Sequence, residues 1–526
     1  MILIASAAYL DKEFQIEFGK LPPAFLPIGN RRLYERQLVV IKNKFPDEDI
    51  YISLPDTYEL SKKDAVYLDR KNIKLIYNPT TLQLGSSILR SISIMNATSD
   101  SKNFRLLHGD TLLLDMPDEL DVISVAEANN DYPWEVELSS DHSESIWCGF
   151  FSFANIEGFE ECLKVNSENF LDAVYQYDKK YPLVRLPALG WLDFGHINMY
   201  FRSRSKLTSE RVFNELVIEH GCVRKSGHPF SKIDGEWQWF KNLPVGMRIY
   251  APNLIDHGKL DSGAPYYKIE YLALVPLNEV YVHGRNSTNY WSNVFELCAN
   301  FFKDCKLNKI KSGDSPTLTA SNFICMIKSL VWARVKTYFK YSDLKGLDTT
   351  NVFNGEILPS LRFIINDCLS KLKVTEDHLT LVHGDFCLSN IFFDSRLDRI
   401  KVIDPRGIDF NGKKTNQGDL RYDLAKLSHS IIGLYDYIIA GAYDLNYSHD
   451  ECLSNYDLKI HIDQRTKDIQ NIFLRYNFSV GITVSEVLPL TTLLFFTMLP
   501  LHREDKSRQI ALLANALRLY SMGVKK

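Results

Sequence analysis

The sequence predicts an α/β domain followed by a two-lobed α+β domain, and three observations support this. First, 526 residues exceed one ordinary domain, because a domain takes about 100–200 residues. Second, short apolar runs alternate with helical patterns over residues 1–205. Third, a β-rich stretch at 211–285 precedes long helical patterns at 286–526. We therefore expect one α/β domain, then a small lobe and a larger helical lobe with a cleft between them.

The composition is that of a globular protein, with 45% hydrophobic and 24% charged residues. The formal net charge of −4 provides no basic field, so we expect no nucleic-acid partner. Nine Cys without C-x-x-C spacing indicate reduced thiols in a cytoplasmic protein. The start, MILIASAAYLDKEF, turns acidic too soon for a signal peptide. The longest apolar run, 487–501, falls short of the roughly 18–20 residues of a membrane span, which favours a core helix. The sequence gives no indication of oligomeric state.

The first domain is predicted from apolar runs that are typical of strands, with the helical pattern RLYERQLVVIKNKF between two of them. The runs lie at 1–6, 49–54, 73–78, 104–110 and 121–127. Alternation of strand and helix predicts a mostly parallel sheet, in which ligands bind at the carboxyl ends of strands. Asp110 follows one such strand in HGD, and Asp193 lies in GWLDFG towards the end of the domain.

The order of several motifs in this domain is similar to that of the nucleotide-sugar pyrophosphorylases, which are nucleotidyltransferases of the GT-A-like Rossmann type. The motifs are PPAFLPIGNRRLYERQL, LGSSILRSI, LLHGDTLLLD, WCGFFSF and GWLDFGHINMY. The resemblance implies that Asp110 and Asp193 bind Mg²⁺ and that Gly85 lies in the segment that contacts the base or sugar. It also implies attack of a phosphomonoester on the α-phosphate of a nucleoside triphosphate, with release of pyrophosphate.

The phosphate loop of that family is altered in this chain. The family pattern is close to A-G-x-x-x-R with a later P-K pair, but Ala8 stands at the Gly position, Lys12 at the Arg position and Pro23 at the Lys position. A Gly lets backbone N–H groups close on phosphates, and the two cations stabilise the departing pyrophosphate. Lys12 or Lys20 would have to replace them. The alternatives are an active nucleotidyltransferase or a degenerate domain that binds a nucleotide or sugar, or only scaffolds its neighbour.

The second domain begins with apolar patterns at 213–227 and 266–282, which predict antiparallel strands, and with helical spacing at 231–244 between them. Later, the helical patterns are interrupted at 379–410 by two short strand-like runs, each ending in polar residues. This order predicts a small β-rich lobe before a helical lobe.

Three polar residues of that interruption suit one chemistry. Asp385 follows an apolar run, Asn390 lies five residues later, and Asp404 follows a second apolar run. An Asp that accepts a hydroxyl proton, with an Asn and a second Asp as hard oxygen ligands, suits Mg²⁺-assisted phosphoryl transfer. The alternative is three unrelated turn residues.

The stretch HGDFCLSN followed by VIDPRG resembles the catalytic and metal-binding motifs of the aminoglycoside phosphotransferase and choline kinase superfamily. These are small-molecule kinases with the protein-kinase fold, and the resemblance spans about 211–526. It implies ATP as phosphoryl donor, Asp385 as catalytic base, and Asn390 and Asp404 as Mg²⁺ ligands. The later GDLRYDLAKLSHSI resembles the start of a helix in this superfamily, and it gives Asp423 a structural role.

A kinase-like small lobe implies a Lys on a strand and a Glu on the next helix, which together hold the α- and β-phosphates. Lys225 in CVRKSG and Glu236 in KIDGEWQWF fit these positions. The alternative is an exposed strand Lys and a solvated helix Glu. No G-x-G-x-x-G loop precedes Lys225. His383 is expected to pack and to hydrogen-bond the catalytic turn.

Together the motifs suggest a bifunctional enzyme. The kinase would phosphorylate a hydroxyl of a sugar, polyol or amino alcohol, and the first domain would join that phosphate to a nucleotide from a second nucleoside triphosphate. A looser resemblance of IDPRG and RVFNELVIEHGCVRKS to kinase-like proteins encoded with bacterial capsule and surface-polysaccharide enzymes implies a nucleotide-activated product for polysaccharide synthesis. The alternatives are a kinase with a degenerate first domain and a non-catalytic binding protein. Aromatic residues in GEWQWF and APYYKIEY suit core packing better than a choline cage, and the region 420–500 is expected to contact the acceptor.

Overall fold

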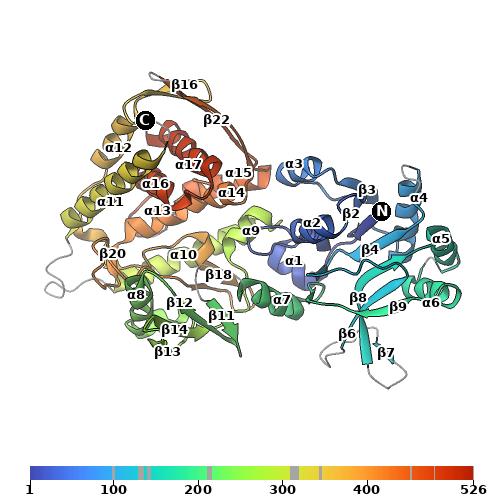
Figure 1. The fold of residues 1–526 in the computed structure, drawn as a ribbon. Coiled ribbons are helices and arrows are strands. Elements are labelled where there is room, and N and C mark those ends of the chain that lie inside the picture. Colours follow the sequence, from blue (N-terminus) through green and yellow to red (C-terminus); the bar gives the residue numbers. More distant parts are fainter. Residues whose placement is uncertain are drawn as a thin grey trace. The chain divides into compact units, whose positions relative to one another are not determined.

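The chain forms two compact units, Met1–Lys206 with His283–Asn286 and Leu207–Val282 with Ser287–Lys526. The computed structural model describes residues 1–97, 101–127, 136–138, 144–166, 168–209, 216–308, 319–342, 346–449, 453–478 and 480–524. The predicted start of the small lobe, at 211, lies outside the described residues. The predicted fold class is confirmed, because an α/β unit precedes a unit with a small antiparallel sheet and a larger helical part (Figure 1).

The first unit is built on an eight-stranded sheet with the order β3-β2-β1-β4-β8-β6-β9 and with β7 beside β8. The pairings of β1 with β2, β2 with β3, β1 with β4 and β6 with β9 are parallel, whereas β8 pairs antiparallel with β4, β6 and β7. Five of these strands fall on the predicted runs. The bounds are β1 Ile2–Ala5, β2 Ile50–Pro55, β3 Lys74–Asn78, β4 Phe104–His108, β6 Val122–Glu127, β7 Val136–Leu138, β8 Glu144–Phe153 and β9 Val184–Pro187.

Helices connect these strands, and several begin at a residue whose side chain accepts a backbone N–H of the first turn. Asp11, Ser61 and Asn155 do so for α1, α3 and α5, which is the usual reason such residues precede a helix. The bounds are α1 Lys12–Phe18, η1 Pro23–Phe25, α2 Leu33–Lys44, α3 Lys62–Arg70, α4 Leu84–Asn96, α5 Ile156–Val165, α6 Phe170–Lys180 and α7 Ile197–Ser209.

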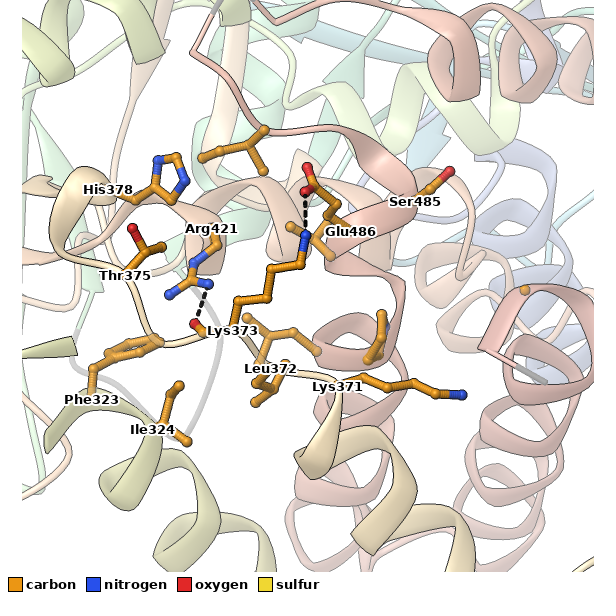
Figure 2. Close-up of a pocket in the computed structure, with 15 residues that line it drawn as sticks. Phe323, Ile324, Lys371, Leu372, Lys373, Thr375, His378, Arg421, Ser485 and Glu486 are labelled. Carbon is orange, nitrogen blue, oxygen red and sulfur yellow. Dashed lines mark hydrogen bonds and ion pairs between the residues drawn. The ribbon is translucent and has the colours of Figure 1, made fainter. Parts of the chain in front are cut away.

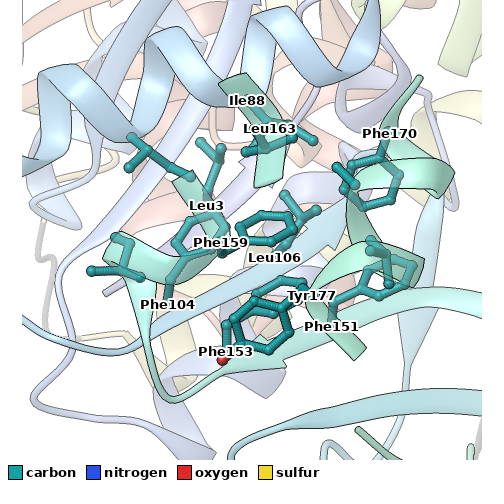
Figure 3. Packing of buried hydrophobic residues seen from close by; sticks show 14 of the residues in the cluster. Leu3, Ile88, Phe104, Leu106, Phe151, Phe153, Phe159, Leu163, Phe170 and Tyr177 are labelled. Carbon is teal, nitrogen blue, oxygen red and sulfur yellow. The ribbon is translucent and has the colours of Figure 1, made fainter. Parts of the chain in front are cut away.

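The core of the first unit lies between the sheet and α4, α5 and α6, and it is rich in aromatic rings (Figure 3). Phe153 of β8 stacks on Phe159 of α5 with ring centroids 3.8 Å apart. Burial of such side chains supplies most of the stabilisation of an element that has few polar contacts. The labelled members are Leu3, Ile88, Phe104, Leu106, Phe151, Phe153, Phe159, Leu163, Phe170 and Tyr177.

The small lobe of the second unit, defined here as residues 216–282, contains a four-stranded antiparallel sheet with the order β11-β12-β14-β13. The helical prediction at 231–244 corresponds to α8. The strand prediction over 266–282 is wrong in its second half, where α9 follows Pro276. The bounds are β11 Leu216–Glu219, β12 Cys222–Ser226, α8 Phe230–Lys241, η2 Val245–Tyr250, β13 Leu254–Lys259, β14 Pro265–Glu270 and α9 Leu277–His283.

The helical lobe, defined as residues 287–524, contains long helices and several short strands. Its strands β17 and β20 pair with each other, β18 and β19 form a hairpin, and a further sheet has the order β16-β15-β22-β21. The strand bounds are β15 Thr350–Phe353, β16 Glu356–Leu358, β17 Leu379–Leu381, β18 Ile391–Asp394, β19 Arg399–Val402, β20 Gln417–Asp419, β21 Tyr443–His449 and β22 Leu453–Ile460. The helix bounds are α10 Thr288–Leu307, α11 Ala320–Tyr341, α12 Leu361–Ser370, η3 Glu376–His378, η4 Leu388–Asn390, α13 Leu420–Ile431, α14 Tyr435–Ile439, α15 Gln464–Arg475, α16 Val484–Met498, η5 Leu499–His502, α17 Lys506–Leu519 and η6 Tyr520–Val524.

The apolar run at 487–501 belongs to a longer helical stretch than the sequence suggested. Val484–His502, formed by α16 and η5, has 19 residues and is long and apolar enough to cross a membrane by length and composition. Of its apolar window, 72% is buried inside the protein. α16 contacts α11, α12, α13 and α17, so in this structure it lies in the core of the helical lobe (Figure 1).

Candidate active sites

In the first unit, two short strands bring the predicted metal ligands together. Asp110 follows β4, and Asp193 ends β10 (Trp191–Asp193), which pairs antiparallel with β5 (Thr111–Leu113) and sets Asp193 opposite Thr111. Both carboxylates approach Gly195, where an added Cβ would lie 2.7 Å from Asp110 Oδ2 and 3.4 Å from Asp193 Oδ1. Any larger residue at 195 would therefore displace the Asp110 carboxylate from its present position.

The two acids have the electrostatics of a site that favours a cation. Burial and the negative charge of Asp110 together raise the pKa of Asp193 to about 6. His196 Nδ1 lies 3.2 Å from Asp193 Oδ2 and opposes this effect. Two carboxylates supply the hard oxygen ligands that Mg²⁺ prefers, so the residues present fit the implied metal. In the described part of the chain, no group of three or more His, Cys, Asp or Glu side chains could hold a metal ion.

A cavity of about 350 Å³ opens beside Asp110, and Ala8 and Pro23 of the altered phosphate loop line it. No Lys or Arg of the described residues lines it. Lys12 begins α1, and Lys20 Nζ lies 4.2 Å from the ring centroid of Tyr9. Gly85 is buried in the first turn of α4, whose residues Leu84 and Ser87 line the cavity. The lining residues are Ala5, Ser6, Ala7, Ala8, Pro23, Ser53, Leu82, Gln83, Leu84, Ser87, His108, Gly109 and Asp110.

In the second unit, the loop after β17 is held by the first turns of α13. The Asp423 carboxylate, which is fully buried, accepts the backbone N–H groups of His383 at 2.7 Å and Gly384 at 2.8 Å. His383 is buried, and its Nε2 lies 3.0 Å from the carbonyl oxygen of Ile403. Burial lowers the pKa of His383 to about 4, which keeps this imidazole neutral. The structural role inferred for Asp423 agrees with this geometry.

Asp385 lies in this loop, and each of its carboxylate oxygens has a partner. Lys426 Nζ of α13 lies 2.8 Å from Oδ1, and Asn390 Nδ2 lies 3.3 Å from Oδ2. Asn390 Nδ2 also donates to the backbone carbonyl of Asp385 at 2.9 Å. Burial opposes ionisation of Asp385, but the charge of Lys426 outweighs it and holds the pKa of Asp385 well below its usual range. Asp385 is therefore ionised and fixed in orientation.

Asp404 is bound by the small lobe. Lys225 Nζ of β12 donates to Asp404 Oδ1 at 2.9 Å and to Glu236 Oε2 of α8 at 2.8 Å. Lys225 is 5% exposed and Glu236 is 0% exposed, whereas Asp404 keeps 38% exposure. Burial opposes ionisation of Asp404, but Lys225 lowers its pKa. Tyr267 Oη donates to Glu236 Oε2 at 2.7 Å and fixes the buried carboxylate further.

The loop that carries Asp404 is strained and packed closely against α8. Asp404 has a φ of 54°, in the left-handed region that non-Gly residues rarely adopt and that is often found at functional sites. At Gly407, an added Cβ would lie 2.0 Å from the carbonyl oxygen of Gly235, so only Gly permits this approach. The contact places the start of the Glu236 turn beside the Asp404 loop.

Asn390 and Asp404 are neighbours in space because the backbone N–H of Ile403 donates to the Asn390 carbonyl oxygen at 3.0 Å. The Asn390 amide nitrogen donates to Asp385, and the Asn390 amide oxygen lies on the other branch of the side chain, 3.4 Å from Ser389 Oγ. Lys225 binds Oδ1 of Asp404. These carbonyl and carboxylate oxygens are the donor type that Mg²⁺ requires, so the residues fit that ion.

The structure thus brings five predicted residues into one connected site in the second unit and two into one site in the first. The five are Lys225, Glu236, Asp385, Asn390 and Asp404. Sequence reasoning missed Lys426, although its sequence signal is a cation among apolar residues of a helix, in YDLAKLSHSI. It also missed His196 beside Asp193 and Ser430, which accepts the Leu388 N–H at 3.2 Å.

The aromatic residues of the small lobe have separate packing partners. Trp239 is buried and its Nε1 donates to the carbonyl oxygen of Val382 at 2.8 Å. Trp237 stacks on His257 with ring centroids 4.0 Å apart. Tyr266 Oη donates to Asp256 at 2.8 Å. These positions agree with core and surface packing.

A further cavity, of about 260 Å³, lies in the helical lobe and is lined by none of the seven predicted site residues, all of which the structure describes (Figure 2). Its charged lining groups are paired within the protein. Lys373 Nζ lies 3.3 Å from Glu486 Oε1, and Arg421 Nη1 donates to the Lys373 carbonyl oxygen at 2.6 Å (Figure 2). The floor is apolar, with Leu372 and Leu490 among its residues.

Comparison with known proteins gives similar folds at low identity. No protein-family model matches the chain, and no curated protein sequence matches it. A nucleoside-diphosphate-sugar pyrophosphorylase from Vibrio cholerae RC9 is 14% identical over 39% of this chain and 99% of its own, with a TM-score of 0.33. HddC from Yersinia pseudotuberculosis is 14% identical over 39% and 99%, with a TM-score of 0.29. The chain is also similar to a thermostable mutant of aminoglycoside phosphotransferase APH(4)-Ia, at 14% identity over 60% of this chain and 98% of that chain, with a TM-score of 0.32.

Proposed function

We propose that the second unit is a phosphotransferase that uses ATP and Mg²⁺ to phosphorylate a hydroxyl group of a small molecule. The observation that carries this proposal is the position of Lys225, whose ammonium bridges buried Glu236 and partly exposed Asp404. A cation fixed in this way suits the α- and β-phosphates of a nucleotide. Asn390 lies next to Asp404, because its carbonyl oxygen accepts the N–H of Ile403, the residue before Asp404. Asp385 lies beside Asn390 and accepts a hydrogen bond from its amide.

Each residue of this site has a distinct part in the proposed reaction. Asp385 orients the acceptor hydroxyl and receives its proton as the oxygen attacks the γ-phosphorus. Lys225, held by Glu236, binds the phosphates of the departing ADP. Asn390 and Asp404 would hold Mg²⁺, which supplies neutralisation of phosphate charge when bound. The acceptor is a sugar, polyol or amino alcohol.

The test is consumption of ATP by the full chain, with and without candidate alcohols. Asp385→Ala is expected to lower turnover by at least about 100-fold, because both the base and its orientation are lost. Asp457→Ala removes an exposed carboxylate of β22 and is the matched control, which should retain wild-type turnover. Equal turnover in the wild type and Asp385→Ala would exclude the proposal.

For the first unit we propose a nucleotidyltransferase-like role, with a ligand-binding domain as the second candidate. Asp110 and Asp193 around Gly195 favour a metal-dependent reaction on a phosphate. The cavity without Lys or Arg among its described lining residues favours binding without turnover. Pyrophosphate release with each of CTP, UTP, GTP and dTTP plus sugar phosphates separates the two. Release that Asp110→Ala abolishes would support catalysis, and no release with any pair would support the binding role.

If both units act in sequence, the phosphomonoester made by the second is the substrate of the first, and the product is a nucleotide-activated building block. The proposed setting is cytoplasmic synthesis of precursors for a surface polysaccharide, on the resemblance of the sequence motifs. Detection of a nucleotide-linked product from ATP, a second nucleoside triphosphate and an unphosphorylated sugar tests this directly.

A further inference from the structure

Three residues on one face of α13 contact residues 383–388, which we call the catalytic loop. Asp423, Lys426 and Ser430 are spaced by three and four positions, so they lie on the same side of the helix. They contact successive parts of residues 383–388. Asp423 binds the backbone N–H groups that open the loop, Lys426 binds the Asp385 side chain, and Ser430 accepts the N–H of Leu388. The loop is therefore held at its start, its centre and its end by one rigid helix.

Lys426 is an unusual residue for its position in this helix. Its side chain is 9% exposed, whereas its neighbours Leu424, Ala425 and Leu427 are fully buried apolar residues. An ammonium group in such surroundings loses its hydration and needs an anionic partner. Asp385 provides it, at 2.8 Å, and remains 36% exposed on its other side. An apolar residue at 426 would remove the desolvation cost, so packing alone does not account for the Lys.

The contact fixes the orientation of the Asp385 carboxylate. Lys426 holds Oδ1 from the interior, and the other contacts of the side-chain oxygens with the loop are longer, at 3.3 Å from Asn390 Nδ2 and 4.0 Å from Cys387 Sγ. Without Lys426, rotation about the Asp385 side-chain bonds would be restrained only by these two weaker contacts. The Lys426 charge also offsets the repulsion between the Asp385 carboxylate and an approaching anionic phosphoryl group.

We infer that Lys426 is the positioning residue of the Asp385 carboxylate in phosphoryl transfer, an inference that rests on the proposed function of the second unit. It acts through Asp385 and is assigned no contact with substrate. Its loss should lower kcat and leave the KM for ATP nearly unchanged, because the phosphates are bound by Lys225 on the small lobe.

The experiment compares steady-state ATP hydrolysis by the full chain with Mg²⁺, with water as the acceptor. Lys426→Met keeps the length of the side chain and is expected to lower kcat by about 100-fold, the usual effect of a misplaced catalytic group. Lys426→Arg keeps the charge and should recover at least a tenth of the wild-type kcat. In the Asp385→Ala background, Lys426→Met should lower kcat no further, because the residue that it positions is gone.

Controls separate this inference from folding and from the proposed function. Lys306→Met removes a half-buried Lys of α10 that donates to the carbonyl oxygen of Val480 at 2.7 Å, and it should keep the wild-type kcat. Two results would overturn the positioning role alone. One is a further loss of kcat when Lys426→Met is added to Asp385→Ala, and the other is a wild-type kcat in Lys426→Met. Absence of Asp385-dependent turnover in the wild type would overturn the proposed function, and this inference with it.

Discussion

Lys225 Nζ lies 2.9 Å from Asp404 Oδ1, although 179 positions separate the two residues in the chain. The first residue lies on a strand of the small lobe, and the second lies in a strained loop of the helical lobe. The same ammonium binds Glu236, so one cation is shared by two carboxylates of unequal exposure. Glu236 is completely buried and fixes the Lys, whereas Asp404 remains open to a ligand.

Replacement of Lys225 by Met should impair nucleotide use. The variant removes the buried cation from both Glu236 and Asp404 and leaves Glu236 with Tyr267 and the exposed Lys232 as its contacts. We expect kcat/KM for ATP to fall by about 100-fold or more, and the loss of a partner from a buried pair should cost about 3–5 kcal/mol of stability. Steady-state kinetics and urea unfolding measure the two effects.

Lys232→Met is the matched control for that variant. Lys232 lies on the same helix as Glu236, with its Nζ 3.6 Å from Glu236 Oε1, but its side chain is 51% exposed. A solvated ion pair contributes about 0–1 kcal/mol, so kinetics should remain close to wild type. If Lys225→Met kept the wild-type KM and kcat for ATP, Lys225 would have no part in phosphate binding.

Replacement of Gly195 by Ala should weaken the acidic site of the first unit. The new Cβ would lie 2.7 Å from Asp110 Oδ2, closer than a real Cβ contact allows, so the carboxylate must move. Binding of Mn²⁺ to the full chain, measured by electron paramagnetic resonance, should weaken by about 10-fold or more. The measurement is made with Asp404→Asn in all samples, which removes the proposed site of the helical lobe.

Gly246→Ala serves as the control for that experiment, since a Cβ at position 246 meets nothing within 4 Å. Asp110→Ala gives the affinity that remains without one ligand. Unchanged Mn²⁺ affinity in both Gly195→Ala and Asp110→Ala would mean that the two carboxylates do not share a metal.

Acid should destabilise the second unit through His429. This imidazole is buried between the rings of Tyr435 and Phe495, with centroids at 4.5 and 4.1 Å, and its Nε2 has no hydrogen-bond partner among the residues that the structure describes. Burial lowers its pKa well below the ordinary value near 6.5, and the charge of Lys426 lowers it further. Asp385 opposes this effect, whereas His502 reinforces it.

The sign of the pH dependence follows from that shift. Below about pH 6.5 the unfolded chain binds a proton at His429 that the folded chain does not, so the contribution of His429 to the free energy of unfolding decreases as the pH falls from 7 to 5. One such proton contributes at most about 1.4 kcal/mol per pH unit. His429→Phe keeps the ring packing and should make this slope shallower in urea unfolding at pH 7, 6 and 5. An equally steep slope in the variant would show that His429 titrates normally in the folded protein.

The sequence was sufficient for most of the first unit because its strands are apolar runs of the expected length. The runs at 1–6 and 49–54, for example, correspond to β1 and β2, which are buried almost throughout. Prediction was wrong at 277–282, where alternating apolar residues suggested a strand. Pro276 ends the preceding extended segment and Glu279 lies in the first turn, and both favour the helix α9 that the structure contains.

The failure to predict some strands of the helical lobe has a different cause. In β21, YDLNYSH, the residues Tyr443, Leu445 and Tyr447 alternate with polar residues, although every residue of the strand is half-buried or exposed. This two-residue period is typical of a strand, and the prediction of a helical lobe overlooked it. The pairing of β21 with β22 is decided by tertiary context.

The residues of the candidate site that lie in local sequence motifs could be predicted, whereas those supplied by a helix distant in sequence could not. HGDFCLSN and VIDPRG contain Asp385, Asn390 and Asp404 in fixed order. The partner of Asp385, Lys426, lies 41 positions after it and is recognised only when α13 is packed against the loop. A buried Lys in an apolar helix face is the signal that such a partner exists.

The most direct measurement of the central claim is a crystal structure of the full chain with AMP-PNP and Mn²⁺, in which the anomalous signal of Mn²⁺ locates the metal. We expect one Mn²⁺ within coordination distance of the Asp404 carboxylate and the Asn390 amide oxygen, with the γ-phosphate facing Asp385 and the other phosphates at Lys225. A nucleotide bound away from Lys225, or Mn²⁺ bound to neither Asp404 nor Asn390, would contradict it.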